Sequence, residues 1–137
     1  MTEAIERTLE LDAAPDDVWR ALTDPTELSG WFGDTAELSP TLGGEGWFGW
    51  EAHGKYSMRV EVFDPPKRLA WRWAREPDTP LDETASTLVE WTLTPRPDGG
   101  TTLTLRESGF VREEDRQANV KGWKKELEEL QAFLSAA

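Results

Sequence analysis

The sequence predicts an α+β fold in which a curved antiparallel sheet of about six or seven strands wraps around one long C-terminal helix. Three observations lead to this prediction. Residues 112–134 carry apolar side chains at helical spacing, most of the preceding chain alternates apolar and polar residues, and short turns join the alternating segments. Strands joined by short turns lie antiparallel beside each other, and the helix would cover their buried face.

The length of the chain favours one domain. With 137 residues, 37% of them hydrophobic, the chain is large enough for one packed core and too short for two. We therefore expect a single domain over residues 1–137.

The N-terminal segment predicts one strand followed by two short helices. Residues 4–12 alternate in polarity, which is typical of a half-buried strand. Pro15, followed by two acidic residues, begins a helix over residues 15–22. Asp24 is the expected N-cap of the second short helix, because Pro25 behind it suits the first helical position.

The middle of the chain predicts about six further strands. Each segment alternates or is rich in β-branched and aromatic residues, and turns containing Gly, Pro or Asp separate the segments. The predicted strands span residues 35–38, 47–51, 56–63, 68–74, 86–94 and 101–107. Residues 75–85 are polar and contain two prolines, which indicates an exposed loop.

The C-terminal helix is predicted from one apolar stripe and an acidic first turn, which favours the positive end of the helix dipole. The stripe consists of Val120, Trp123, Leu127, Leu130 and Leu134. Gly122 interrupts the helix interior, where glycine costs about 1 kcal/mol relative to alanine. We interpret Gly122 as a close approach of another segment or a slight bend.

The charge and composition argue against several classes of function. A net charge of −12 repels a phosphate backbone, and the lysines near the C-terminus alternate with glutamates, so nucleic acid is not an expected partner. The chain has no cysteine, which excludes disulfides and thiolate metal sites. No apolar run approaches the roughly 18 residues of a membrane span, and no signal peptide is recognisable, so we expect a cytoplasmic protein.

Several motifs, taken in order, resemble one known family over essentially the whole chain. They are Val-Trp-Arg-Ala-Leu-Thr-Asp-Pro at 18–25, Trp-Phe-Gly-Asp at 31–34, Asp-Pro-Pro at 64–66, Leu-Ala-Trp at 69–71, Glu-Ser-Gly-Phe at 107–110, and Gly-Trp at 122–123 with Leu127 and Leu130. The sequence thereby resembles the activator of heat-shock-protein-90 ATPase homologue family, within the START-like (SRPBCC) superfamily of polyketide cyclases and lipid-transfer proteins. The resemblance implies a helix-grip fold, in which the sheet clasps the C-terminal helix and leaves a hydrophobic cavity between them.

Catalytic and metal-binding motifs are not found in the sequence. His53 is the only histidine, so a two-histidine metal site cannot form, and no serine-nucleophile or zinc-protease string occurs. Because His53 lies in a turn beside a glycine, we expect its side chain to be exposed. We therefore predict no catalytic residue, no metal ligand and no cofactor.

The aromatic residues, including eight tryptophans, are the remaining functional signal. Rings at alternating strand positions either pack the core or line a pocket, and the set as a whole favours a pocket. The candidate cavity residues are Trp31, Phe32, Trp50, Trp71, Trp73, Trp91, Phe110 and Trp123. We expect planar apolar ligands between the C-terminal helix and the face that carries Trp71, Trp73 and Trp91.

Two charged residues complete the predicted cavity. Alternation places Arg7 on the inward face of the first strand, and Glu107 on the inward face of the last strand. In a helix-grip sheet these strands are neighbours, so Arg7 and Glu107 are candidates for a buried ion pair that orients a ligand. The alternative is that Arg7 extends its head to solvent at the rim.

Two classes of function follow. The first is a binding protein for a small hydrophobic molecule, such as an aromatic, lipid or polyketide-like compound. The second is an interaction module that docks on a chaperone or another protein. A cyclase-like enzyme is a third possibility, because cyclase relatives shape a substrate in the cavity with little acid-base help.

Overall fold

The computed structural model describes residues 3–135. The elements follow in the order β1 (Ile5–Leu11), α1 (Pro15–Thr23), α2 (Pro25–Leu28), β2 (Thr35–Leu38), β3 (Glu45–Trp50), β4 (Gly54–Asp64), β5 (Arg68–Ala74), the 3-10 turn η1 (Leu81–Glu83), β6 (Ser86–Pro95), β7 (Thr101–Ser108) and α3 (Glu113–Ser135). The predicted order of strand, two short helices, strands and long helix is thus confirmed.

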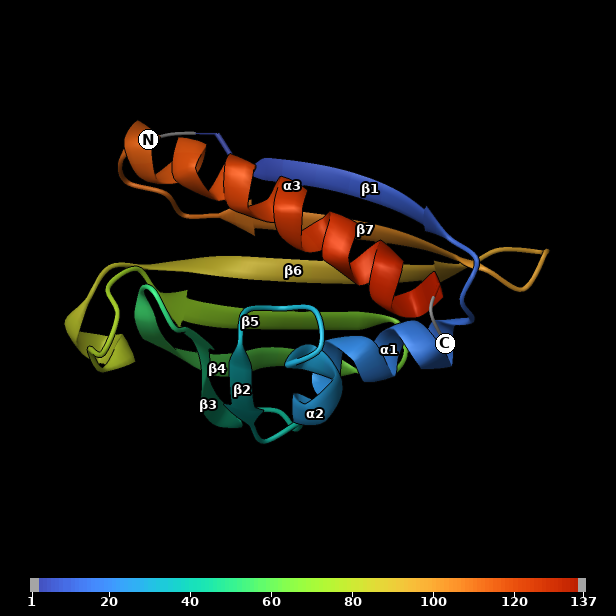
Figure 1. The fold of residues 1–137 in the computed structure, drawn as a ribbon, viewed down its shortest axis with the longest axis horizontal. Helices are drawn as coiled ribbons and strands as arrows, with labels where there is room; N and C mark the ends of the chain where they lie inside the picture. Colours follow the sequence, from blue (N-terminus) through green and yellow to red (C-terminus); the bar gives the residue numbers. More distant parts are fainter. Residues whose placement is uncertain (1–2, 136–137) are drawn as a thin grey trace.

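All seven strands form one antiparallel sheet, in the order β1-β7-β6-β5-β4-β3-β2. Strands β2 to β7 follow each other as a meander, and β1 closes the far edge by pairing with β7. Helix α3 crosses one face of the curved sheet obliquely, and its C-terminal end lies near α1 (Figure 1). This arrangement is the predicted helix-grip fold. No helix in residues 3–135 combines the length and the hydropathy needed to cross a membrane.

The starts of the short helices follow the predicted rules. Proline occupies the first turn of both α1 and α2. A backbone N–H in the first turn has no acceptor within the helix, so the missing N–H of proline costs no hydrogen bond there. The Asp24 side chain caps α2 by accepting a hydrogen bond of 2.8 Å from the Thr26 backbone N–H. Helix α1 has no side-chain cap, so packing of its buried residues against the sheet supplies more of its stability.

The stripe on α3 faces the sheet as predicted. Trp123, Leu127 and Leu130 are buried, and the two stripe residues nearer the helix ends are half-buried. Glu126 is buried on the same helix although it is charged. The apolar stripe does not predict the burial of Glu126, which depends on contacts with the α2–β2 connection and the end of β3.

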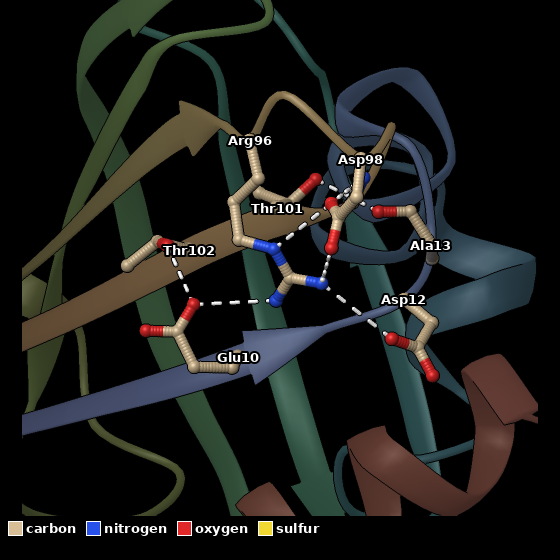
Figure 2. Close-up of polar contacts among 8 residues, drawn as sticks. Glu10, Asp12, Ala13, Arg96, Asp98, Thr101 and Thr102 are labelled. Atoms are coloured by element: carbon tan, nitrogen blue, oxygen red, sulfur yellow. Dashed lines mark hydrogen bonds and ion pairs between the residues drawn. The ribbon is translucent and has the colours of Figure 1, made fainter.

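The end of β1 is held against the turn between β6 and β7 by Arg96 (Figure 2). Its guanidinium lies 2.9 Å from Asp98, 3.2 Å from Glu10 and 3.5 Å from Asp12. Thr102 donates a further hydrogen bond of 2.6 Å to Glu10. The Thr102 hydroxyl together with Arg96 lowers the pKa of Glu10, and Arg96 lowers the pKa of Asp98. The network thereby fixes the end of β1 to the exposed turn between β6 and β7.

Candidate functional site

An open cavity of about 380 Å³ lies between the first half of α3 and one end of the sheet. Because the strands are antiparallel, the end of β3, the start of β4 and the end of β5 meet at this end of the sheet. The cavity is lined by Phe32, Trp50, His53, Tyr56, Trp73, Ala74, Arg75, Ala118, Asn119, Gly122, Trp123, Lys125 and Glu126. A mostly apolar hollow with a few polar groups is typical of a small-molecule site.

Stacked aromatic rings form the apolar wall of the cavity. The Phe32 ring lies 5.5 Å from that of Trp123 with an interplanar angle of 15°, and 5.7 Å from that of Trp73 with an angle of 26°. Trp50 meets Phe32 edge-on at 5.1 Å. These rings come from the α2–β2 connection, two strands and α3, so the wall exists only in the folded chain. Such a wall suits a flat, apolar molecule.

The other predicted aromatic residues pack the core instead. Trp31, Trp71, Trp91 and Phe110 are each at most 3% exposed and do not line the cavity. The Trp31 indole donates a hydrogen bond of 2.8 Å to the Ala21 carbonyl, which anchors this ring beneath α1. The face of Trp71, Trp73 and Trp91 is therefore largely filled, and only Trp73 reaches the cavity, because α3 covers the middle of the sheet.

The polar wall carries cationic and phenolic groups. Arg75 has a guanidinium carbon 5.7 Å from the centre of the Phe110 ring and a guanidinium nitrogen 3.7 Å from Asp115. Its Nε atom is buried without a hydrogen-bond acceptor among residues 3–135. Burial raises the pKa of the Tyr56 phenol, so Tyr56 stays protonated at neutral pH. These groups can meet a polar substituent on a bound ring.

His53 lies in the exposed turn that the sequence predicts, and it also lines the cavity. No group of His, Asp and Glu side chains within residues 3–135 is arranged to hold a metal ion.

Gly122 opens the cavity from the helix side. Residues 118, 119, 122, 125 and 126 are spaced by three and four, so they share one face of α3, and all of them line the cavity. A Cβ atom built on Gly122 would meet nothing within 4 Å. The interpretation of Gly122 as a close approach is thus wrong. The missing side chain leaves room in the cavity.

Glu107 is fully buried behind the aromatic wall and is held by neutral donors. The indole N–H groups of Trp123 and Trp73 donate to its carboxylate at 2.7 and 2.8 Å. The Thr87 hydroxyl donates at 2.5 Å, and the Asn119 amide donates to both oxygens at 3.0 and 3.1 Å. Hydrogen bonds of this kind to a buried carboxylate replace the water that it loses on folding.

The predicted ion pair between Arg7 and Glu107 does not form. Arg7 is exposed, and its guanidinium donates to the backbone carbonyl of Glu6 at 2.6 Å. Arg7 pairs in register with Leu105, so it does occupy the inward side of β1. However, β1 is an edge strand, which lets the long side chain reach solvent at the rim, and the tryptophans already satisfy Glu107.

Glu126 joins α3 to the α2–β2 connection and to the end of β3. Its carboxylate accepts long hydrogen bonds of 3.4 Å from the Gly33 backbone N–H and from the Trp50 indole. Desolvation by burial raises the pKa of Glu126, and these two bonds only partly offset that effect. The folded protein therefore holds the charged form of Glu126 at a cost.

This cost predicts a pH-dependent effect of Glu126→Gln. A raised pKa means that the folded state binds the proton more tightly, so the contribution of Glu126 to stability is full below its unfolded pKa of about 4.5 and is lost as pH rises through the folded value. Glu126→Gln should therefore melt like the parent near pH 4 and at a higher temperature near pH 7. Glu128→Gln, on the exposed side of α3, is the control. A Glu126→Gln melting temperature that falls below the parent at pH 7 contradicts this sign.

Of the predicted cavity residues, Phe32, Trp50, Trp73 and Trp123 line the cavity. Arg7, Glu107 and the four core rings do not. Sequence reasoning missed Tyr56, Arg75, Asn119 and the acidic Glu126. Helical spacing from Trp123 to Asn119 and Glu126 could have indicated two of them, since residues three or four apart share a helix face.

The whole chain is similar to known proteins in sequence family and in fold. A family model described as activator of Hsp90 ATPase homolog 1-like protein matches residues 12–135. Protein MLL2253 from Mesorhizobium loti is 27% identical, with a TM-score of 0.84, and the match covers 98% of each chain. DynU16, from the dynemicin biosynthetic locus, is 27% identical with a TM-score of 0.80, and the match covers 98% of this chain and 48% of that one.

The Aha1 dimer from Colwellia psychrerythraea is also similar in fold, with a TM-score of 0.81, 20% identity and coverage of 97% and 96%. No curated protein sequence matches the chain. DynU16 and the Aha1 dimer carry different descriptions and share this fold. The fold alone therefore does not define a function, and the cavity carries the functional argument.

Proposed function

Because the chain belongs to the family of activator of Hsp90 ATPase homolog 1-like proteins, whose solved neighbours share a sheet wrapped around a long helix, we propose that it binds a small, flat hydrophobic molecule in the cavity beside α3. The observation that carries the proposal is the open cavity of about 380 Å³ with a wall of stacked rings. Such a volume and lining are in the range of small-molecule sites.

The similarity to DynU16 agrees with a small-molecule ligand. DynU16 belongs to a biosynthetic locus, and at 27% identity it covers nearly all of this chain. A flat molecule that enters the cavity would contact the faces of Phe32, Trp73 and Trp123 and displace water from them. The cationic and phenolic groups that also line the cavity would orient its polar substituents.

Gly122 provides a direct test. Gly122→Leu should fill the cavity from α3 and abolish ligand binding, because its side chain enters open space. The same change should raise the free energy of unfolding by up to about 1 kcal/mol, since leucine favours a helix over glycine. Binding is measured by tryptophan quenching and by the shift in melting temperature with a panel of flavonoids, fatty acids and polyketides. Native mass spectrometry of the purified protein checks for a molecule that co-purifies.

Gly122→Ala is the matched control. It adds one methyl group, raises helix propensity in the same direction and leaves most of the cavity open. We expect the parent and Gly122→Ala to bind and Gly122→Leu not to bind. If no compound shifts the parent, the proposal is wrong. Equal binding by Gly122→Leu and the parent would place the ligand elsewhere. If the cavity instead serves only to dock a chaperone, neither Gly122 variant should change small-molecule binding.

A further inference from the structure

The amide of Asn119 has a fixed orientation in the cavity wall. Its Nδ2 atom lies 3.0 and 3.1 Å from the two oxygens of Glu107. A carboxylate accepts hydrogen bonds, so the NH₂ end of the amide must face Glu107, and the reversed amide would set two acceptors against each other. The chemistry of Glu107 therefore decides which end of Asn119 points away from it.

The other contacts of Glu107 reinforce this polarity. The indole nitrogens of Trp73 and Trp123 can only donate, and both donate to Glu107. Thr87 accepts from Trp73 at 2.9 Å, so its own proton is directed to Glu107 at 2.5 Å. Every neighbour in this buried network is a donor to one carboxylate. Asn119 has no arrangement that satisfies Glu107 other than the one observed.

The second end of the amide has no partner among the described residues. Asn119 Oδ1 accepts no hydrogen bond from any residue in the part of the chain that the structure describes, and Asn119 lines the cavity. Asn119 stands one helical turn before Trp123, so its amide lies at the edge of the aromatic wall. A flat ring that stacks on this wall would bring its edge to Asn119.

We propose that Asn119 Oδ1 is the acceptor that selects flat aromatic ligands carrying a hydroxyl at their edge, that is, phenols. Glu107 is the positioning residue that holds Asn119 in this orientation. The inference rests on the proposed function, because it assigns a ligand class to the same cavity. A phenol donates its proton to Oδ1, whereas the corresponding methyl ether has no proton to donate and leaves the acceptor without a partner.

A matched pair of probes tests the selection. 2-Naphthol and 2-methoxynaphthalene share the naphthalene ring system. They differ in that a methyl group replaces the hydroxyl proton in the second compound. We expect isothermal titration calorimetry to show that the parent protein binds 2-naphthol about tenfold more tightly, which is the size of one net hydrogen bond. Asn119→Leu keeps a side chain of similar size and should bind both probes with equal affinity.

Two further variants identify the acceptor. Glu126 also presents a carboxylate to the cavity, and Glu126→Leu removes this second candidate acceptor. The preference for 2-naphthol should remain in this variant. Glu107→Gln offers an amide donor to Asn119 and lets its amide turn around, so the preference should fall while binding of 2-methoxynaphthalene remains. If Glu107→Gln does not fold, the comparison between Asn119→Leu and the parent decides the question.

The outcomes separate this inference from the proposed function. If the parent binds neither probe and nothing in the broader panel, both proposals fail. If it binds both probes equally, the cavity is a ligand site but Asn119 does not select a hydroxyl. A preference that persists in Asn119→Leu and disappears in Glu126→Leu assigns the acceptor to Glu126 and overturns the inference.

Discussion

Trp123→Ala is expected to lower the free energy of unfolding by about 5 kcal/mol, because it combines a core cavity with the loss of a buried hydrogen bond. The ring is 2% exposed and stacks on Phe32 at 5.5 Å, so its removal leaves a large void between α3 and the sheet. The same change deletes the indole N–H that donates to Glu107 at 2.7 Å. A loss of this size approaches the total stability of many domains.

Two variants separate the causes of this loss. Trp123→Phe keeps most of the ring and removes the N–H, so it should cost about 2 kcal/mol, as expected for a bond to a charged group. Lys124→Ala changes an exposed neighbour on α3 and should shift stability by less than about 0.5 kcal/mol. Chemical denaturation at pH 7 measures all three. Equal losses for Trp123→Ala and Lys124→Ala would contradict the assignment of the buried face of α3.

Glu107→Leu is expected to lower the free energy of unfolding by about 4 kcal/mol, although leucine is apolar and similar in size. The substitution leaves the Trp123 indole and the Thr87 hydroxyl without their acceptor in a dry environment. An unsatisfied buried donor costs about 1 to 3 kcal/mol. The removal of a desolvated charge offsets part of this cost, so the loss is smaller than a simple sum.

Glu37→Leu is the control for Glu107→Leu. Glu37 is an exposed strand residue in β2, so the same chemical change should alter stability by less than about 0.5 kcal/mol. Denaturation curves of both variants give the comparison. A Glu107→Leu protein as stable as the parent would mean that the Trp123 indole and the Thr87 hydroxyl find other acceptors. Glu107 would then not be needed to explain the orientation of the Asn119 amide.

The elements were predictable because their signals are local. Alternation at every second residue marked β5 and β7 with their inward faces, and spacing by three and four marked the buried stripe of α3. The pairing of the first strand with the last was expected from the resemblance to the helix-grip fold, and it is confirmed. Of the two alternatives for Arg7, the structure shows extension to solvent at the rim, because alternation assigns a face but not how far a long side chain reaches from an edge strand.

The sequence by itself determined the order of the elements, the inward position of Glu107 and the supply of aromatic rings, since each depends on neighbours within a few residues along the chain. Only the tertiary structure decided which rings fill the core and which line the cavity, because that depends on where α3 crosses the sheet. It also decided that Glu107 meets tryptophans from β5 and α3 in place of an arginine. Such contacts join residues far apart in sequence, and no local pattern encodes them.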